Sequence, residues 1–175
     1  GKLEVFPTKI DPRFADVCAV RRRDPAWLYE PKLDGYRVIA YVHDGSVRLV
    51  SRGGLDLTMQ FPEIVADLAD QAVGAMILDG EIVALDPDGR PSFNALQNRA
   101  QLKTPQEIAA AQRAMPVVLV CFDLLHFAGV NVRDCAYVDR RRYLAQCLLP
   151  SAHLQLIHAV DDGEALFAAA LEHGF

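Results

Sequence analysis

The sequence predicts an α+β domain in which antiparallel β-sheets are flanked by helices. Short strands that end at Asp-Gly turns dominate the first half of the chain, and helical patterns separate the later strands. The regular alternation of strand and helix that builds a parallel sheet is not seen in the sequence. With 175 residues, 51% of them hydrophobic and 23% charged, the chain is long enough for one domain with a sizeable core.

The strands are predicted from apolar and β-branched runs bounded by turn residues. Asp34-Gly35 marks a turn, and Asp44-Gly45 predicts a hairpin between two strands. The continuous apolar run Val117–Phe122 indicates a central strand that is buried on both faces. We expect residues 1–25 to be irregular because three prolines interrupt them. The predicted strands span residues 26–32, 36–42, 47–52, 75–85, 115–127 and 154–160.

Helices are predicted where apolar residues recur at helical spacing. Ser92 is a candidate N-cap, and Thr104 with Glu107 forms a capping signature three residues apart. Arg140-Arg141-Arg142 lies in an amphipathic pattern, and we expect these arginines on the solvated face of their helix. The predicted helices span residues 61–71, 92–99, 104–113, 137–148 and 162–173.

Composition and charge limit the class of protein. No apolar run approaches the ~20 residues that a membrane span needs, so no membrane association is expected. The four cysteines form no Cys-x-x-Cys pattern, which argues against a zinc site and favours reduced thiols in a cytoplasm. The formal charge is −5, but residues 1–60 hold 10 of the 18 basic and only 8 of the 23 acidic residues. This basic excess permits a polyanionic partner, and nothing in the sequence indicates an oligomer.

Polar residues interrupt the apolar strands at four places. Charges that are buried or line a cleft are costly unless they are paired. Because these residues recur where strands are expected to end, we predict that they share one cleft. Unrelated ion pairs at the sheet edge would be the better explanation of any single cluster. The four clusters are Lys32/Asp34/Arg37, Arg52, Asp79/Glu81 and Asp123.

The order of these clusters resembles that of a known family, the nucleotidyltransferase (adenylation) domain of ATP-dependent DNA ligases. The sequence resembles in particular the bacterial ligases of the ligase D and ligase C kind, which act in non-homologous end joining. The resemblance covers nearly the whole chain from about Trp27, and it implies a covalent nucleotidyltransferase (ATP-grasp-like) fold. The matching motifs are Lys32-Leu33-Asp34-Gly35, Ser51-Arg52-Gly53-Gly54, Leu78-Asp79-Gly80-Glu81 and Phe122-Asp123-Leu124-Leu125.

The resemblance implies three catalytic residues. Lys32 would attack the α-phosphate of ATP and form lysyl-AMP, with release of pyrophosphate. Arg37 and Arg52 would contact the AMP phosphate or the 5′-phosphate of a DNA nick, because a guanidinium suits phosphate oxygens. Both cations would also favour the neutral, nucleophilic form of Lys32.

The resemblance also implies which residues bind the nucleotide. Glu30 would accept a hydrogen bond from the adenine amino group, which would favour ATP over GTP. Phe122 would stack on the adenine ring, and Glu81 would hold a ribose hydroxyl or a metal-bound water. Pro31 and Leu33 flank Lys32 and would line the same site. The implied cofactors are ATP and Mg²⁺ (or Mn²⁺), with Glu81 as the candidate metal-binding residue.

The resemblance further implies that residues 1–175 are a partial adenylation domain. The family continues with a Glu-Gly motif, a lysine-rich motif and an OB-fold domain, which we expect to be absent from this chain. The expected partners are nicked double-stranded DNA and a Ku-type end-binding protein, in the nucleoid of a bacterial cytoplasm. The alternatives are an RNA ligase, a capping-type nucleotidyltransferase, or a non-catalytic nucleotide-binding fragment or scaffold.

Overall fold

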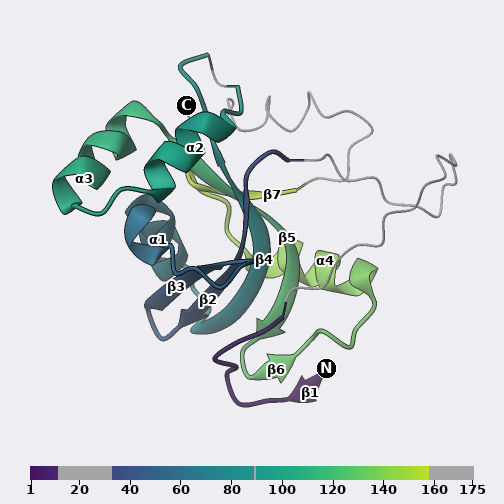
Figure 1. The fold of residues 1–175 in the computed structure, drawn as a ribbon. Coiled ribbons are helices and arrows are strands. Elements are labelled where there is room, and N and C mark those ends of the chain that lie inside the picture. Colours follow the sequence, from purple (N-terminus) through teal and green to yellow (C-terminus); the bar gives the residue numbers. More distant parts are fainter. Residues whose placement is uncertain (12–32, 89, 158–175) are drawn as a thin grey trace, which may run out of the picture.

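A computed structural model describes residues 1–11, 33–88 and 90–157 of the chain (Figure 1). Seven strands form one sheet in the order β1-β6-β5-β4-β2-β3, and β7 pairs with β5 outside this path. The pairs along the path are antiparallel, and β7 runs parallel to β5. The strands are β1 (Lys2–Leu3), β2 (Tyr36–His43), β3 (Ser46–Ser51), β4 (Ala75–Ala84), β5 (Val117–Phe127), β6 (Val130–Asn131) and β7 (Leu154–Leu156).

The helices confirm the α+β prediction, and three of them cover one face of this sheet. Ile64, Leu68, Leu96 and Leu144 from three of the helices join one buried core with apolar residues of β2, β4 and β5. Figure 1 shows that α4 lies beside β5. The helices are α1 (Pro62–Ala69), α2 (Phe93–Ala100), α3 (Pro105–Ala114) and α4 (Tyr137–Cys147), with a short 3-10 helix, η1 (Thr58–Gln60).

The predicted helix caps and hairpin turn are confirmed. Ser92 accepts a hydrogen bond from the backbone N–H of Ala95, and Thr104 forms the complete capping box with Glu107. Asp44 and Gly45 both have positive φ, 48° and 78°, as the tight turn between β2 and β3 requires. The strands themselves fall close to their predicted limits, except that β7 ends at Leu156. The predicted strand 26–32 and helix 162–173 lie outside the described residues.

The second face of the sheet carries a polar belt between two apolar clusters. Along β4, Ile77 belongs to one cluster, Asp79 and Glu81 follow it, and Val83 belongs to the other. Side chains alternate between faces along a strand, so these four residues point to the same side. We define the polar belt as Arg37, Asp79, Glu81 and Asp123. The prediction that these charges sit at strand ends is wrong for Asp79, Glu81 and Asp123, which lie within β4 and β5. It is confirmed for Arg37, the second residue of β2, and for Arg52, which directly follows β3.

An irregularity in β5 shapes this belt. Gly80 of β4 is paired with Cys121, whereas the next residue, Asp79, is paired with Asp123. Phe122 is therefore an extra residue, a β-bulge, which sets two residues of one strand opposite one of the other. The bulge brings Asp123 directly opposite Asp79. Gly80 fits this tight crossing because a Cβ there would lie 2.7 Å from the Val120 carbonyl oxygen.

The middle of β5 is buried, as predicted for the central strand. Val117, Leu119 and Cys121 are fully buried on the helix-covered face. Val118 and Val120 are almost fully buried on the other face. The complete burial of Cys121 confirms that it is a core residue, and this burial raises the pKa of its thiol. Across the described residues, no helix is both long and apolar enough to cross a membrane.

Candidate active site

The candidate site begins where Glu81 contacts the segment that follows Lys32. The backbone N–H of Gly35 donates a hydrogen bond of 3.0 Å to Glu81 Oε1. Gly35 itself lies against β4, because a Cβ at this position would be only 2.1 Å from the Ile82 carbonyl oxygen. Glu81, the last residue of the Leu78-Asp79-Gly80-Glu81 motif, therefore holds Gly35, the last residue of the Lys32-Leu33-Asp34-Gly35 motif.

Burial sets the ionisation of Glu81. Desolvation raises the pKa of this carboxyl group, and the Gly35 N–H and nearby Arg37 only partly oppose that effect. The charged form of Glu81 is thus destabilised in the folded protein relative to the unfolded chain.

Replacement of Glu81 by Gln should therefore raise the melting temperature at pH 7. The amide oxygen can still accept the Gly35 hydrogen bond, while the half-buried charge is removed. With a raised folded pKa, the stabilisation by the protonated carboxyl is complete below the ordinary value of 4.5 and is lost as the pH rises through the folded pKa. The difference between variant and wild type should therefore grow from pH 4 to pH 7 in thermal melts.

Glu107→Gln serves as the matched control with the opposite sign. Hydrogen bonds from Thr104 lower the pKa of the exposed Glu107 carboxyl group, so its charge stabilises the fold above the ordinary value of 4.5. Glu107→Gln should slightly lower the melting temperature at pH 7. If both variants lower the melting temperature by the same amount, the proposed destabilisation of the Glu81 charge by burial is contradicted.

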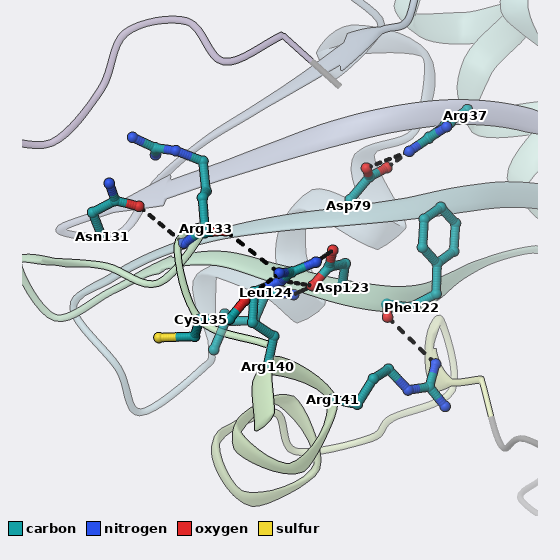
Figure 2. Close-up of polar contacts among 10 residues, drawn as sticks. All are labelled: Arg37, Asp79, Phe122, Asp123, Leu124, Asn131, Arg133, Cys135, Arg140 and Arg141. Atoms are coloured by element: carbon teal, nitrogen blue, oxygen red, sulfur yellow. Dashed lines mark hydrogen bonds and ion pairs between the residues drawn. The ribbon is translucent and has the colours of Figure 1, made fainter. Parts of the chain in front are cut away.

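Arg37 contacts residues of the third and fourth predicted motifs, Asp79 and Phe122. Its Nε and Nη2 donate to Asp79 Oδ1 and Oδ2 at 3.0 and 2.7 Å, which is a bidentate ion pair. This pairing raises the pKa of the Arg37 guanidinium, which is charged throughout the physiological range. The guanidinium carbon also lies 5.3 Å from the centre of the Phe122 ring. Arg37 is thus fixed between a carboxylate and an aromatic ring (Figure 2).

A pocket of about 660 Å³ opens beside these residues. Its volume is in the usual range for a small-molecule site. Arg52, at the end of β3, donates its backbone N–H to the Arg37 carbonyl oxygen at 3.1 Å, which aligns the two arginines. The pocket therefore brings together three of the predicted site residues, Arg37, Arg52 and Glu81.

Phe122 and Leu33 lie in the adjoining apolar cluster and do not line this pocket. Both side chains are half-buried and pack against Val83, Val118 and other residues of β4 and β5. Leu33 is the residue after Lys32, so the first motif leads directly from this cluster toward Gly35. The site thus has an apolar part around Phe122 and a polar part around Arg37 and Arg52. Glu30, Pro31 and Lys32 lie outside the described residues.

The prediction that Arg140, Arg141 and Arg142 share a solvated helix face is wrong for Arg140 and Arg141. Arg140 is buried and forms a bidentate pair with Asp123, with Nε–Oδ1 and Nη2–Oδ2 both 2.8 Å. Arg141 is only partly exposed and donates to the carbonyl oxygens of Phe122 and Ile157. Arg142 is exposed, as predicted. The overlooked signal was Asp123, since a charge inside an apolar strand needs a cation nearby.

The described residues do not form a metal site with several protein ligands. In residues 1–11, 33–88 and 90–157, no group of three or more His, Cys, Asp or Glu side chains could hold a metal ion. Mg²⁺ is commonly bound by one or two carboxylates together with waters and substrate phosphates. Glu81 lines the pocket and fits that kind of site.

The fold is similar to that of solved bacterial ligases. A mycobacterial DNA ligase D complexed with ATP and MES aligns with a TM-score of 0.56 and 35% identity, over 83% of this chain and 44% of that one. The ligase domain of Mycobacterium tuberculosis LigD aligns with a TM-score of 0.55 at the same identity and coverage. The chain therefore has the nucleotidyltransferase fold of ATP-dependent ligases.

Sequence comparison gives the family. The model of the ATP-dependent DNA ligase domain matches residues 13–174, and the chain belongs to this family. Multifunctional non-homologous end joining protein LigD of Pseudomonas aeruginosa is 40% identical over 70% of this chain. The bifunctional LigD of Bacillus subtilis is also 40% identical over 70% of the chain, and LigD of M. tuberculosis is 36% identical over 85%. The matched regions are 14%, 21% and 18% of those proteins.

Proposed function

We propose that this chain is part of the adenylation domain of a bacterial ATP-dependent DNA ligase and that Lys32 carries the AMP. The observation that best supports the proposal is the contact between the motifs. Glu81 binds the Gly35 N–H, and Arg37 links Asp79 to the ring of Phe122. Residues from two distant segments, β4 and β5, are thus held around the segment that follows Lys32.

The proposed reaction proceeds in three transfers. Lys32 Nζ attacks the α-phosphorus of ATP, an N–P bond forms, and the bond to the β-phosphate breaks to release pyrophosphate. The 5′-phosphate of a nick then attacks the same phosphorus, so that AMP passes to the DNA and the lysine amine is regenerated. Finally, the 3′-hydroxyl attacks the activated 5′-phosphate, which forms the phosphodiester and releases AMP.

The lysine must be neutral to act as a nucleophile, although the ordinary lysine pKa is about 10.4. Neighbouring cations destabilise the ammonium form and thereby favour the amine. Arg37 and Arg52 are the candidates among the described residues, because both line the same pocket as Gly35. A bound Mg²⁺ would add to this effect and would stabilise charge on the departing pyrophosphate.

The base and sugar would be recognised by the other predicted residues. Phe122 offers a ring for adenine within an apolar cluster, and Glu30 would accept from the adenine amino group. Glu81 already accepts from Gly35 through Oε1. Its Oε2 would accept from a ribose hydroxyl or a metal-bound water.

The test is covalent labelling with ATP and Mg²⁺. We expect label from α-³²P ATP, none from γ-³²P ATP, and complete loss of label in Lys32→Ala. Lys103→Ala, which removes an exposed lysine far along the chain, should label like wild type. Label that survives Lys32→Ala, or that comes from GTP in preference to ATP, would contradict the proposal. The same assay distinguishes an enzyme from a non-catalytic scaffold.

We further propose nicked double-stranded DNA as the substrate and a Ku-type end-binding protein as a partner in the bacterial nucleoid. Relatives named as non-homologous end joining proteins support both. Those relatives are much longer than this chain, and we propose that sealing needs an OB-fold domain and further motifs outside these 175 residues. Joining the chain to the remaining ligase domain of the M. tuberculosis relative should therefore allow nick sealing.

A further inference from the structure

We propose that Arg140 and Arg141 of α4 are positioning residues that orient the Phe122 ring for the base of the nucleotide. The inference rests on the proposed function, because it takes Phe122 as the residue that stacks on adenine. Neither arginine lines the 660 Å³ pocket, so neither is expected to touch the nucleotide phosphates.

The two arginines contact the bulge at adjacent residues (Figure 2). Arg140 holds the Asp123 side chain through two hydrogen bonds of 2.8 Å, and its Nη1 donates to the Cys135 carbonyl oxygen at 2.7 Å. Arg141 Nη1 donates to the Phe122 carbonyl oxygen at 3.3 Å, and its Nη2 donates to the Ile157 carbonyl oxygen. One arginine therefore fixes the side chain of Asp123, and the next fixes the main chain of Phe122.

The bulge needs such support for two physical reasons. Phe122 is an extra residue of β5 at one of two register shifts, so the regular ladder to β4 does not pair it. The bulge also sets Asp79 directly opposite Asp123, and like charges in this position repel each other. Arg140 neutralises Asp123, just as Arg37 neutralises Asp79 from β2. Without the α4 contacts, a regular strand that separates the two aspartates would be favoured.

The orientation of the ring depends on the same backbone. A shift of β5 to regular pairing would turn Phe122 and move it relative to Arg37, which now lies 5.3 Å from the ring centre. The same shift would also change how the Phe122 ring packs in the apolar cluster that contains Leu33, Val83 and Val118. We therefore expect loss of the α4 contacts to weaken binding of the base and to leave binding of the ribose and phosphate nearly unchanged.

The experiment compares AMP with ribose 5-phosphate, because AMP binding requires no chemistry. Dissociation constants are measured by calorimetry for wild type, Arg141→Met, Phe122→Leu and the double variant. We expect Arg141→Met to weaken AMP binding about tenfold and ribose 5-phosphate binding less than about twofold. In the Phe122→Leu background, the second substitution should add less than about twofold, because Arg141 acts through Phe122.

The controls separate positioning from a general loss of structure. Arg142→Met removes the neighbouring exposed arginine and should change neither ligand's affinity. Arg141→Lys keeps a cationic donor for the carbonyl oxygens and should recover most of the AMP affinity. Equal losses for AMP and ribose 5-phosphate, or additive effects with Phe122→Leu, would overturn the inference and leave the proposed function intact. Failure of wild type to prefer AMP over ribose 5-phosphate would instead contradict the proposed function.

Discussion

Replacement of Arg140 by Met is expected to lower the free energy of unfolding by about 3–5 kcal/mol. The substitution removes both hydrogen bonds to Asp123 and the one to the Cys135 carbonyl oxygen. It leaves a buried carboxylate without its cation, directly opposite Asp79. Denaturant titration of both proteins measures the difference, and the slope of the transition shows whether the native state has changed.

Arg142→Met is the matched control for this prediction. Arg142 is two residues away on the same helix, is exposed, and pairs with Asp139 at 3.2 Å. An exposed pair contributes about 0–1 kcal/mol, so this variant should unfold almost like wild type. The double variant Asp123→Leu/Arg140→Met should recover part of the lost stability, because it leaves no unpaired charge. If Arg140→Met lowers the free energy of unfolding no more than Arg142→Met does, the stabilising role of the buried Arg140–Asp123 pair is contradicted.

Replacement of Gly35 by Ala is expected to reduce labelling by ATP about 100-fold. The new Cβ would lie 2.1 Å from the Ile82 carbonyl oxygen and 3.0 Å from Glu81 Cγ, so the backbone of residue 35 must move away from β4. That movement stretches the hydrogen bond to Glu81 and displaces the motif that contains Lys32. Initial rates of labelling by α-³²P ATP give the size of the effect.

Gly45→Ala shows whether such a loss reflects positioning or stability. Gly45 lies in the turn between β2 and β3 with φ of 78° and no atom within 4 Å of an added Cβ. The positive φ makes alanine unfavourable by roughly 1–2 kcal/mol, but the site is untouched. Gly45→Ala should therefore melt at a lower temperature and label like wild type. If both variants lose labelling in proportion to their decrease in melting temperature, the loss reflects stability, and the role of Gly35 in positioning the Lys32 motif is contradicted.

Much of the fold could be predicted from local sequence signals. Asp44-Gly45 predicts the turn because both positions need positive φ. Thr104 with Glu107 predicts a helix start because the Thr104 hydroxyl accepts from the Glu107 N–H and the Glu107 carboxylate accepts from the N–H of the N-cap Thr104. The central position of β5 follows from its continuous apolar run. These features depend on neighbours in sequence, so the sequence alone contains enough information to place them.

The parts that depend on distant residues could not be predicted in the same way. A bulge at Phe122 is invisible in a run of strand-forming residues, since it depends on the register with β4. The burial of Arg140 depends on Asp123, 17 positions earlier, whereas the helical pattern alone placed all three arginines in solvent. The two-residue strands β1 and β6 are too short to give a pattern. Motif order indicated one site, but the contacts between motifs came only from the structure.

Because Cys121 is buried, the rate at which its thiol is chemically modified reports local unfolding of the sheet around β5. Alkylating reagents react with the thiolate, and burial both raises the pKa of Cys121 and blocks access to its sulfur. Cys135 and Cys147 are partly exposed and should be modified first. Slow modification of Cys121 then measures how often the middle of β5 separates from its neighbours. Suppression of that rate by AMP would report nucleotide binding without any label on the ligand.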